Sequence, residues 1–125
     1  MKKIKLYFYT CAVLLMFSTL VYGQSYPRFK VLAFYSTTVE KAHIDFANDA
    51  IQFFKELTAG NGFVFDTTSN MEDLNDVKIK DYQLLMMIND FPHNQAQRSA
   101  FEKYMENGGG WFGFHVAGYN DRTTN

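Results

Sequence analysis

Three histidines are the side chains best suited to chemistry in this sequence, and each comes shortly after an apolar run. His115 stands in the stretch GGGWFGFHVAG (108–118), which places one imidazole between glycines. His43 follows the apolar run FKVLAFYS, and His93 follows the run YQLLMMI. Because an imidazole changes its charge near neutral pH, it can donate or accept a proton, and it can also bind a metal ion. We therefore expect a functional site to lie where these rings are placed by the fold.

The residues around His115 are typical of a sharp turn after a strand. The segment GFHVAG (113–118) has the outline of a nucleophile elbow, in which small flanking residues let a central side chain project between a strand and a helix. In serine and cysteine enzymes the central residue attacks a carbonyl group. An imidazole at that place would instead act as a general acid or base, or as a metal ligand. We predict a catalytic role for His115 and a ligand-binding role for its neighbour Gly113.

Four short apolar runs are predicted to form strands, since they favour β-structure and have the character of buried parallel strands. Two longer helices lie between them. The first carries an apolar face and ends at GNG (60–62), and the second begins with a capping-box pattern at Asn94 and Gln97 and ends near Asn107. A polar segment at 71–82 is predicted to form a short, irregular helix. The predicted strands are FKVLAFYS (29–36), GFVFDTT (62–68), YQLLMMI (82–88) and GGGWFGFHV (108–116); the inward-facing helix residues are Ile44, Ala47, Ile51 and Phe54 in the first helix and Ala100, Phe101, Tyr104 and Met105 in the second.

This alternation of strands and helices predicts an α/β fold with a doubly wound, flavodoxin-like parallel sheet and helices on both faces. In such folds ligands bind at the carboxyl ends of the strands, near the point where the strand order reverses. All three histidines fall at that edge, although loops and helix caps are also places where histidines commonly occur for structural reasons. We predict catalytic roles for His115 and His43 and ligand-binding roles for Asn89, Asp90, Gly113 and Asp121.

A metal site is an alternative interpretation of the same residues. His43 and His115, together with Asp90 or Asp121, would offer the imidazole and carboxylate ligands that suit zinc. The sequence contains no compact motif such as H-E-x-x-H. We therefore predict no metal and no other cofactor, with zinc as the alternative.

The first 23 residues are typical of a secretory signal peptide. Lys2, Lys3 and Lys5 precede an apolar core, and small Gly23 precedes polar Gln24. A retained membrane anchor is the alternative, because no charged residue occurs between Lys5 and Arg28. We predict cleavage and export to the periplasm or the extracellular space, with membrane contact only through this segment if it stays uncleaved.

Charge and cysteine content narrow the possible functions of residues 24–125. Three of the 12 Lys and Arg residues but none of the 13 Asp and Glu residues lie in the first 23, which leaves a net charge of −4 for the remainder. An acidic surface argues against nucleic acid as a partner. The single cysteine, Cys11, lies within the predicted signal peptide. The exported part would thus have neither a disulfide nor a thiol nucleophile.

The sequence resembles the ThuA-like (trehalose utilisation) family of the class I glutamine amidotransferase-like fold. The stretch AFEKYMENGGGWFGFHVAG (100–118) carries the resemblance, supported by KVLAFYS, His43, the turn GNGF (60–63) and the strand that ends at Asn89. Members of the family have histidine where related amidotransferases have cysteine, and His115 matches that position. The sequence departs from the family pattern at Ala42, which precedes His43, and in the segment DFPH (90–93) after the third strand.

The resemblance implies an exported domain that binds or acts on carbohydrate, either a trehalose-like disaccharide or a keto-sugar derivative, with His43 and His115 flanking the substrate. The alternative is a non-catalytic binding or interaction module on the same scaffold, since the family position lacks the amidotransferase cysteine. ThuA-like domains continue beyond the fourth strand. We therefore interpret residues 24–125 as the N-terminal part of such a domain, with an open edge on its fourth strand.

Overall fold

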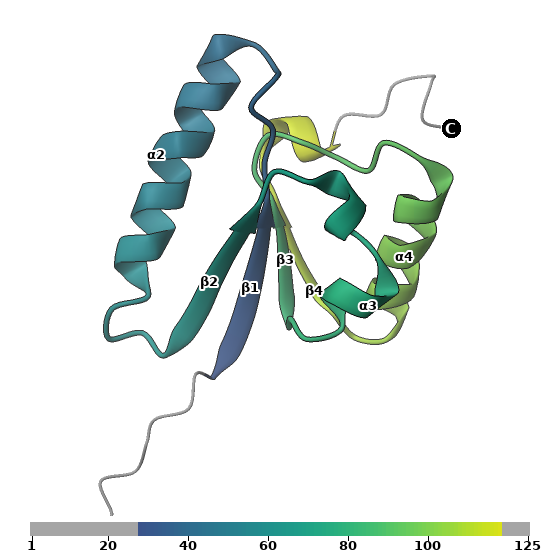
Figure 1. Ribbon diagram of the computed structural model, residues 1–125. Helices are drawn as coiled ribbons and strands as arrows, with labels where there is room; N and C mark the ends of the chain where they lie inside the picture. Colours follow the sequence, from purple (N-terminus) through teal and green to yellow (C-terminus); the bar gives the residue numbers. More distant parts are fainter. Residues whose placement is uncertain (1–27, 119–125) are drawn as a thin grey trace, which may run out of the picture.

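A parallel four-stranded sheet forms the centre of the structure (Figure 1). The structure is a computed structural model that describes residues 28–118. Every neighbouring pair of strands is parallel, and the order across the sheet is β2-β1-β3-β4, which confirms the predicted flavodoxin-like α/β fold. The strands are β1 (Phe29–Phe34), β2 (Phe63–Thr68), β3 (Leu84–Met87) and β4 (Gly110–Gly113).

Helices cover both faces of this sheet, as predicted. The long helix α2 packs on one face, and α3 and α4 lie on the other (Figure 1). The predicted irregular helix is two short elements, a 3₁₀ turn followed by one turn of α-helix. The helical elements are α2 (Lys41–Leu57), η1 (Met71–Asp73), α3 (Asp76–Ile79), α4 (Gln95–Glu106) and η2 (His115–Gly118).

The first strand shows why the apolar runs are continuous rather than alternating. Val31 and Ala33 point to the α2 face, whereas Leu32 and Phe34 point to the face covered by α3 and α4. All four side chains are almost fully buried. A central parallel strand covered on both faces requires apolar residues at every position.

Helix α2 has the apolar face that its sequence predicts, but only part of it is deeply buried. Ala47 and Ala50 are buried, while Ile51 and Phe54 are partly buried against the same core cluster. The helix ends before Gly60 and Gly62, which have φ angles of 80° and 68°. Such positive angles are strained for residues with a Cβ atom, so the predicted glycine stop is confirmed.

Helix α4 begins at its predicted cap and ends at its predicted position. The Asn94 side chain accepts a hydrogen bond from the Gln97 backbone N–H at 2.9 Å. Tyr104 is buried, but the prediction for Met105 is wrong, since this residue is 39% exposed. Successive side chains along a helix are rotated by about 100°. Met105, which directly follows buried Tyr104, therefore points away from the sheet.

The glycines before β4 belong to the end of α4, and the predicted fourth strand is accordingly too long. The Gly108 N–H donates to the Met105 carbonyl and the Gly109 N–H donates to the Tyr104 carbonyl, each at 3.0 Å. This pair of bonds is the Schellman motif, and it requires the positive φ angle of 86° found at Gly108. The strand therefore starts at Gly110, and it ends at Gly113 instead of Val116.

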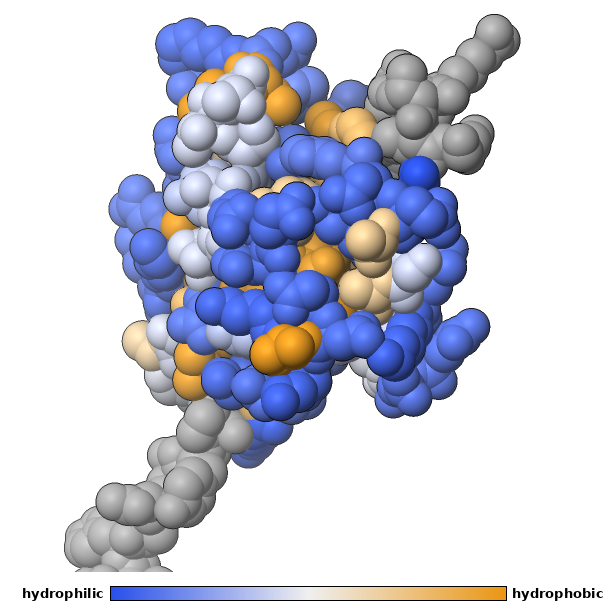
Figure 2. All heavy atoms as spheres, turned by 45° about the vertical axis from the view of Figure 1, so that its right-hand side comes forward, coloured by the Kyte–Doolittle hydropathy of each residue, from blue (hydrophilic) through white to orange (hydrophobic). Residues whose placement is uncertain are grey.

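The outer surface over α3 and α4 is largely hydrophilic, and its apolar atoms form small separate patches (Figure 2). Scattered apolar groups of this kind are normal on a protein surface. Among the described residues, no helix is both long enough and apolar enough to cross a membrane. The predicted signal peptide, residues 1–23, lies outside the described residues.

Candidate functional site at the carboxyl edge

The strand order places a reversal point between β1 and β3. From β1 the chain crosses to β2 on one side, and from β3 it crosses to β4 on the other. The loops that follow β1 and β3 therefore diverge from neighbouring carboxyl ends. Open α/β sheets bind their ligands at this place.

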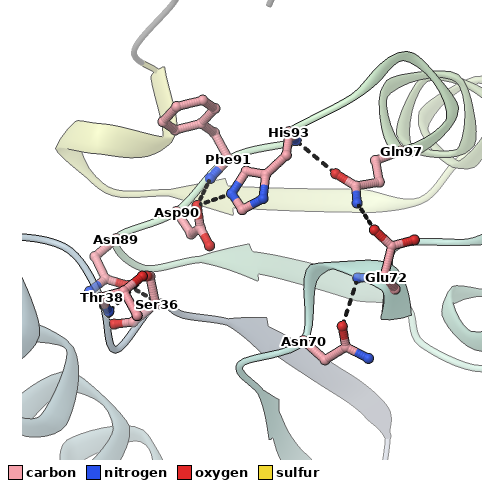
Figure 3. A network of polar contacts seen from close by, with 9 residues as sticks. All are labelled: Ser36, Thr38, Asn70, Glu72, Asn89, Asp90, Phe91, His93 and Gln97. Atoms are coloured by element: carbon pink, nitrogen blue, oxygen red, sulfur yellow. Dashed lines mark hydrogen bonds and ion pairs between the residues drawn. The ribbon is translucent and has the colours of Figure 1, made fainter.

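Asn89 follows β3 at this reversal point and links three backbone groups from two other segments. Figure 3 shows it beside Ser36, in the loop after β1. Its side-chain oxygen accepts the Ser36 N–H at 2.7 Å, and its amide nitrogen donates to the Ser36 carbonyl at 3.0 Å and to the His43 carbonyl at 3.1 Å. Asn89 is 0% exposed. Its amide thus fixes the loop after β1 and the first turn of α2, and a direct contact with a ligand stays a prediction.

The structure brings His43 and His115 together, although 71 residues separate them in the sequence. Their ring centroids are 5.7 Å apart and the rings are tilted by 31°. The His43 side chain is 30% exposed, and its Nδ1 lies 3.5 Å from Glu40 Oε1, whereas His115 is exposed in η2. At this spacing both rings can face one ligand, and the catalytic roles of His43 and His115 stay predictions.

An aromatic contact holds together the two elements that carry these histidines. Phe46 lies one helical turn after His43 in α2, and Phe114 directly precedes His115. The rings of Phe46 and Phe114 meet edge-to-face with centroids 5.1 Å apart. The distance between the two imidazoles is therefore set by packing on the α2 face as well as by the backbone.

The turn that carries His115 differs from a nucleophile elbow in one respect. A nucleophile elbow holds its central residue in a strained conformation. Among the described residues, however, only glycines have positive φ angles. His115 instead begins a single 3₁₀ turn, in which the Ala117 N–H donates to the Phe114 carbonyl at 2.7 Å. The turn therefore presents the His115 ring at the carboxyl edge, as the predicted elbow outline requires, but it does so without a positive φ angle at His115.

Gly113 ends β4 directly beneath this turn. A Cβ atom at this position would lie 2.4 Å from Cζ2 of Trp111 and 3.0 Å from Cβ of Ala117. Close packing therefore explains why residue 113 is glycine, and its ligand-binding role stays a prediction. Asp121 lies outside the described residues.

Asp90 belongs to a second polar network on the same edge (Figure 3). Its Oδ1 lies 2.7 Å from Nε2 of His93 and accepts the Phe91 N–H at 2.9 Å. The Gln97 side chain accepts the His93 backbone N–H at 2.7 Å and donates to Glu72 Oε1 at 2.9 Å. The predicted capping box is thus correct at Asn94, but the Gln97 side chain bonds residue 93 instead of the Asn94 backbone. Sequence reasoning singled out Gln97 only as a cap and missed Glu72.

The described residues contain no group of three or more His, Cys, Asp or Glu side chains placed to hold a metal ion. His43 and His115 are close to each other, but Asp90 bonds His93. The structure therefore offers no support for the zinc alternative within residues 28–118.

Two tyrosines with raised pKa values lie at the opposite, amino edge of the sheet. Burial, together with a 3.0 Å hydrogen bond to Asp66, raises the pKa of Tyr82 to about 12. Burial also raises the pKa of Tyr104, partly offset by the nearby Gly110 N–H, which donates to the Gln83 carbonyl. Both tyrosines border a hollow of about 370 Å³. Perturbed groups in a hollow can mark an active site, but here burial accounts for the raised pKa of both tyrosines, with the Asp66 bond adding to it at Tyr82.

A second hollow, of about 420 Å³, lies between α4 and the segment 72–77. Neither of these two hollows includes His43, His115 or Asp90. We nevertheless place the candidate site at the carboxyl edge, because imidazole and carboxylate groups from separate loops lie together there.

A parallel sheet of this order, with helices on both faces and polar side chains at its reversal point, defines a flavodoxin-like α/β domain. Residues 30–125 match the sequence model of ThuA, described as trehalose utilisation, and the chain belongs to the ThuA family. The predicted family is thereby confirmed.

A crystal structure of a ThuA-like protein from Bacteroides uniformis ATCC 8492 is similar to this chain, with 48% sequence identity and a TM-score of 0.73. The similarity covers 81% of this chain and 41% of that one, so the chain spans less than half the length of that protein. No curated protein sequence matches the chain.

Proposed function

We propose that this ThuA-like domain binds or acts on a carbohydrate, either a trehalose-like disaccharide or a keto-sugar derivative, at the carboxyl edge of its sheet. The observation that carries the proposal is the pairing of His43 and His115, whose ring centroids are 5.7 Å apart beside the strand-reversal point. The trehalose-utilisation description of the matching family suggests the class of ligand. His43 and His115 are the proposed acid–base groups, and no metal ion is required.

Exposed aromatic rings near this pair support a sugar ligand. Phe112 is exposed on β4, and its ring lies 4.9 Å from that of Phe114, next to His115. Trp111 is also exposed on β4, where its ring meets Phe101 of α4. Flat aromatic faces pack against the apolar faces of sugar rings, while imidazoles bond their hydroxyl groups.

The test is calorimetric titration with trehalose and with a keto derivative of trehalose. His43→Ala and His115→Ala are each expected to weaken binding, and Asn48→Ala on the exposed side of α2 serves as the control. If neither sugar binds, or if both histidine variants bind as the unaltered protein does, the proposal fails.

The second candidate is a non-catalytic binding module. It is favoured by the histidine at position 115, where the family resemblance places the amidotransferase cysteine, and by the unstrained turn at His115. Sugar binding without chemical conversion of either sugar supports this candidate over an enzyme.

Export is part of the proposal, and it rests on the sequence of residues 1–23. The mass of the mature protein tests it, since cleavage after Gly23 is expected. A mature protein that retains Met1–Gly23 contradicts cleavage.

A further inference from the structure

The Asp90–His93 pair joins a buried carboxylate to an exposed imidazole. Its 2.7 Å contact joins a carboxylate that is 9% exposed to an imidazole that is 53% exposed. A buried carboxylate that bonds one ring nitrogen fixes the orientation of an imidazole. The exposed ring is thereby presented at the surface in one orientation.

The surroundings of the pair restrict its movement. The Asp90 carboxylate also accepts the Phe91 N–H, and the buried Gln97 side chain holds the His93 backbone. Glu72 holds Gln97 in turn. Figure 3 shows this chain of contacts running from the loop after β2 to the loop after β3. Both the ring and its backbone are therefore anchored by residues with low exposure.

One ring nitrogen remains for a ligand. Nε2 of His93 bonds Asp90, and within residues 28–118 Nδ1 makes no hydrogen bond. A neutral imidazole with its proton on Nε2 presents a lone pair at Nδ1, which accepts a hydrogen bond from a hydroxyl group.

We propose that His93, oriented by Asp90, is a further ligand-contacting residue of the carboxyl edge that accepts a hydrogen bond from a sugar hydroxyl through Nδ1. This inference rests on the proposed function, because it takes the same hydroxyl-rich ligand.

Two substitutions separate this role from a structural brace for the loop. His93→Gln removes the ring but keeps the bond that the backbone N–H of residue 93 donates to the Gln97 side chain. Asp90→Asn keeps an oxygen that can accept both the Phe91 N–H and the His93 ring N–H, and it removes only the charge. We expect His93→Gln to weaken trehalose binding about three- to tenfold, the effect of one lost hydrogen bond. Asp90→Asn is expected to weaken it less, and both variants are expected to melt within a few degrees of the unaltered protein.

The deciding experiment is modification with diethyl pyrocarbonate, which reacts with unprotonated imidazole nitrogens, followed by peptide mass spectrometry of all three histidines. With trehalose at about ten times its dissociation constant, mass action predicts that His93 reacts about tenfold more slowly than without sugar. Protection of His43 and His115 with unchanged reaction at His93 overturns the inference and leaves the proposed function standing. Protection of none of the three overturns both. A His93 that fails to react without sugar also overturns the inference, since Nδ1 must be accessible.

Discussion

Replacing Asn89 tests whether one buried amide holds the carboxyl edge in place. Asn89→Asp keeps the size of the side chain and can still accept the Ser36 N–H. It replaces the amide nitrogen with an oxygen, which then faces the Ser36 and His43 carbonyl oxygens at the 3.0 and 3.1 Å of the present bonds. Two hydrogen bonds become two repulsive contacts at a position with 0% exposure.

The expected loss in the free energy of unfolding follows from these contacts. Each lost bond costs about 1 kcal/mol net, and each buried carbonyl left without a donor raises that cost toward 1–3 kcal/mol. We therefore expect Asn89→Asp to lower the free energy of unfolding by about 3 kcal/mol, with most of the loss coming from the two carbonyl contacts.

Urea denaturation monitored by the fluorescence of Trp111, the single tryptophan, measures this change. Asn48→Asp provides the control, because Asn48 is exposed in α2 and its substitution is expected to change stability by less than about 0.5 kcal/mol. An Asn89→Asp variant as stable as this control would refute the reasoning that Asn89 braces the edge.

Three further predictions concern single groups. His115→Ala is expected to change the free energy of unfolding by less than about 1 kcal/mol because the ring is exposed, yet to weaken sugar binding; a larger stability loss with unchanged binding contradicts the site assignment. Because the pKa of Tyr82 rises from 10.0 to about 12 on folding, the fold favours its protonated form, and stability is expected to fall as the pH rises from 10 to 12. Tyr82→Phe should remove that part of the pH dependence in urea titrations. Gly109→Ala is expected to destabilise by about 1–3 kcal/mol, since its Cβ would lie 2.1 Å from Cε1 of Tyr104, and an unchanged melting temperature would contradict this packing.

The fold was predictable because its signals are local. A strand buried on both faces, such as Phe29–Phe34, needs an uninterrupted apolar run, and Gly60 and Gly62 supply the positive φ angles that end α2. The limits of β4 were not predictable in the same way. Gly108 and Gly109 satisfy the carbonyl groups at the end of α4, so glycines that read as the start of a strand terminate a helix instead.

The candidate site was predictable only as a set of residues at one edge. The order of the elements implied that His43 and His115 share that edge, but their 5.7 Å spacing depends on the contact between Phe46 and Phe114. The bond between Gln97 and Glu72 joins residues 25 positions apart, so no local sequence pattern predicts it. Side-chain partners of this kind follow from how helices pack on the sheet, which periodicity does not specify.

The end of β3 connects the two histidine groups of the carboxyl edge through consecutive residues. Asn89 bonds the loop after β1 and the first turn of α2, which carries His43, whereas Asp90 bonds His93 in the loop before α4. Both side chains are buried although they are polar, and each is satisfied by hydrogen bonds. Buried polar groups cost free energy unless they are fully bonded. The bonds of Asn89 and Asp90 at the strand-reversal point therefore support the proposal that this edge holds the segments of His43 and His93 in fixed positions. The two tyrosines at the opposite edge have no such arrangement. Their pKa values are raised chiefly by burial, and within residues 28–118 neither tyrosine is bonded to a histidine. The chemistry of the domain is therefore expected where the strands end, beside Asn89 and Asp90.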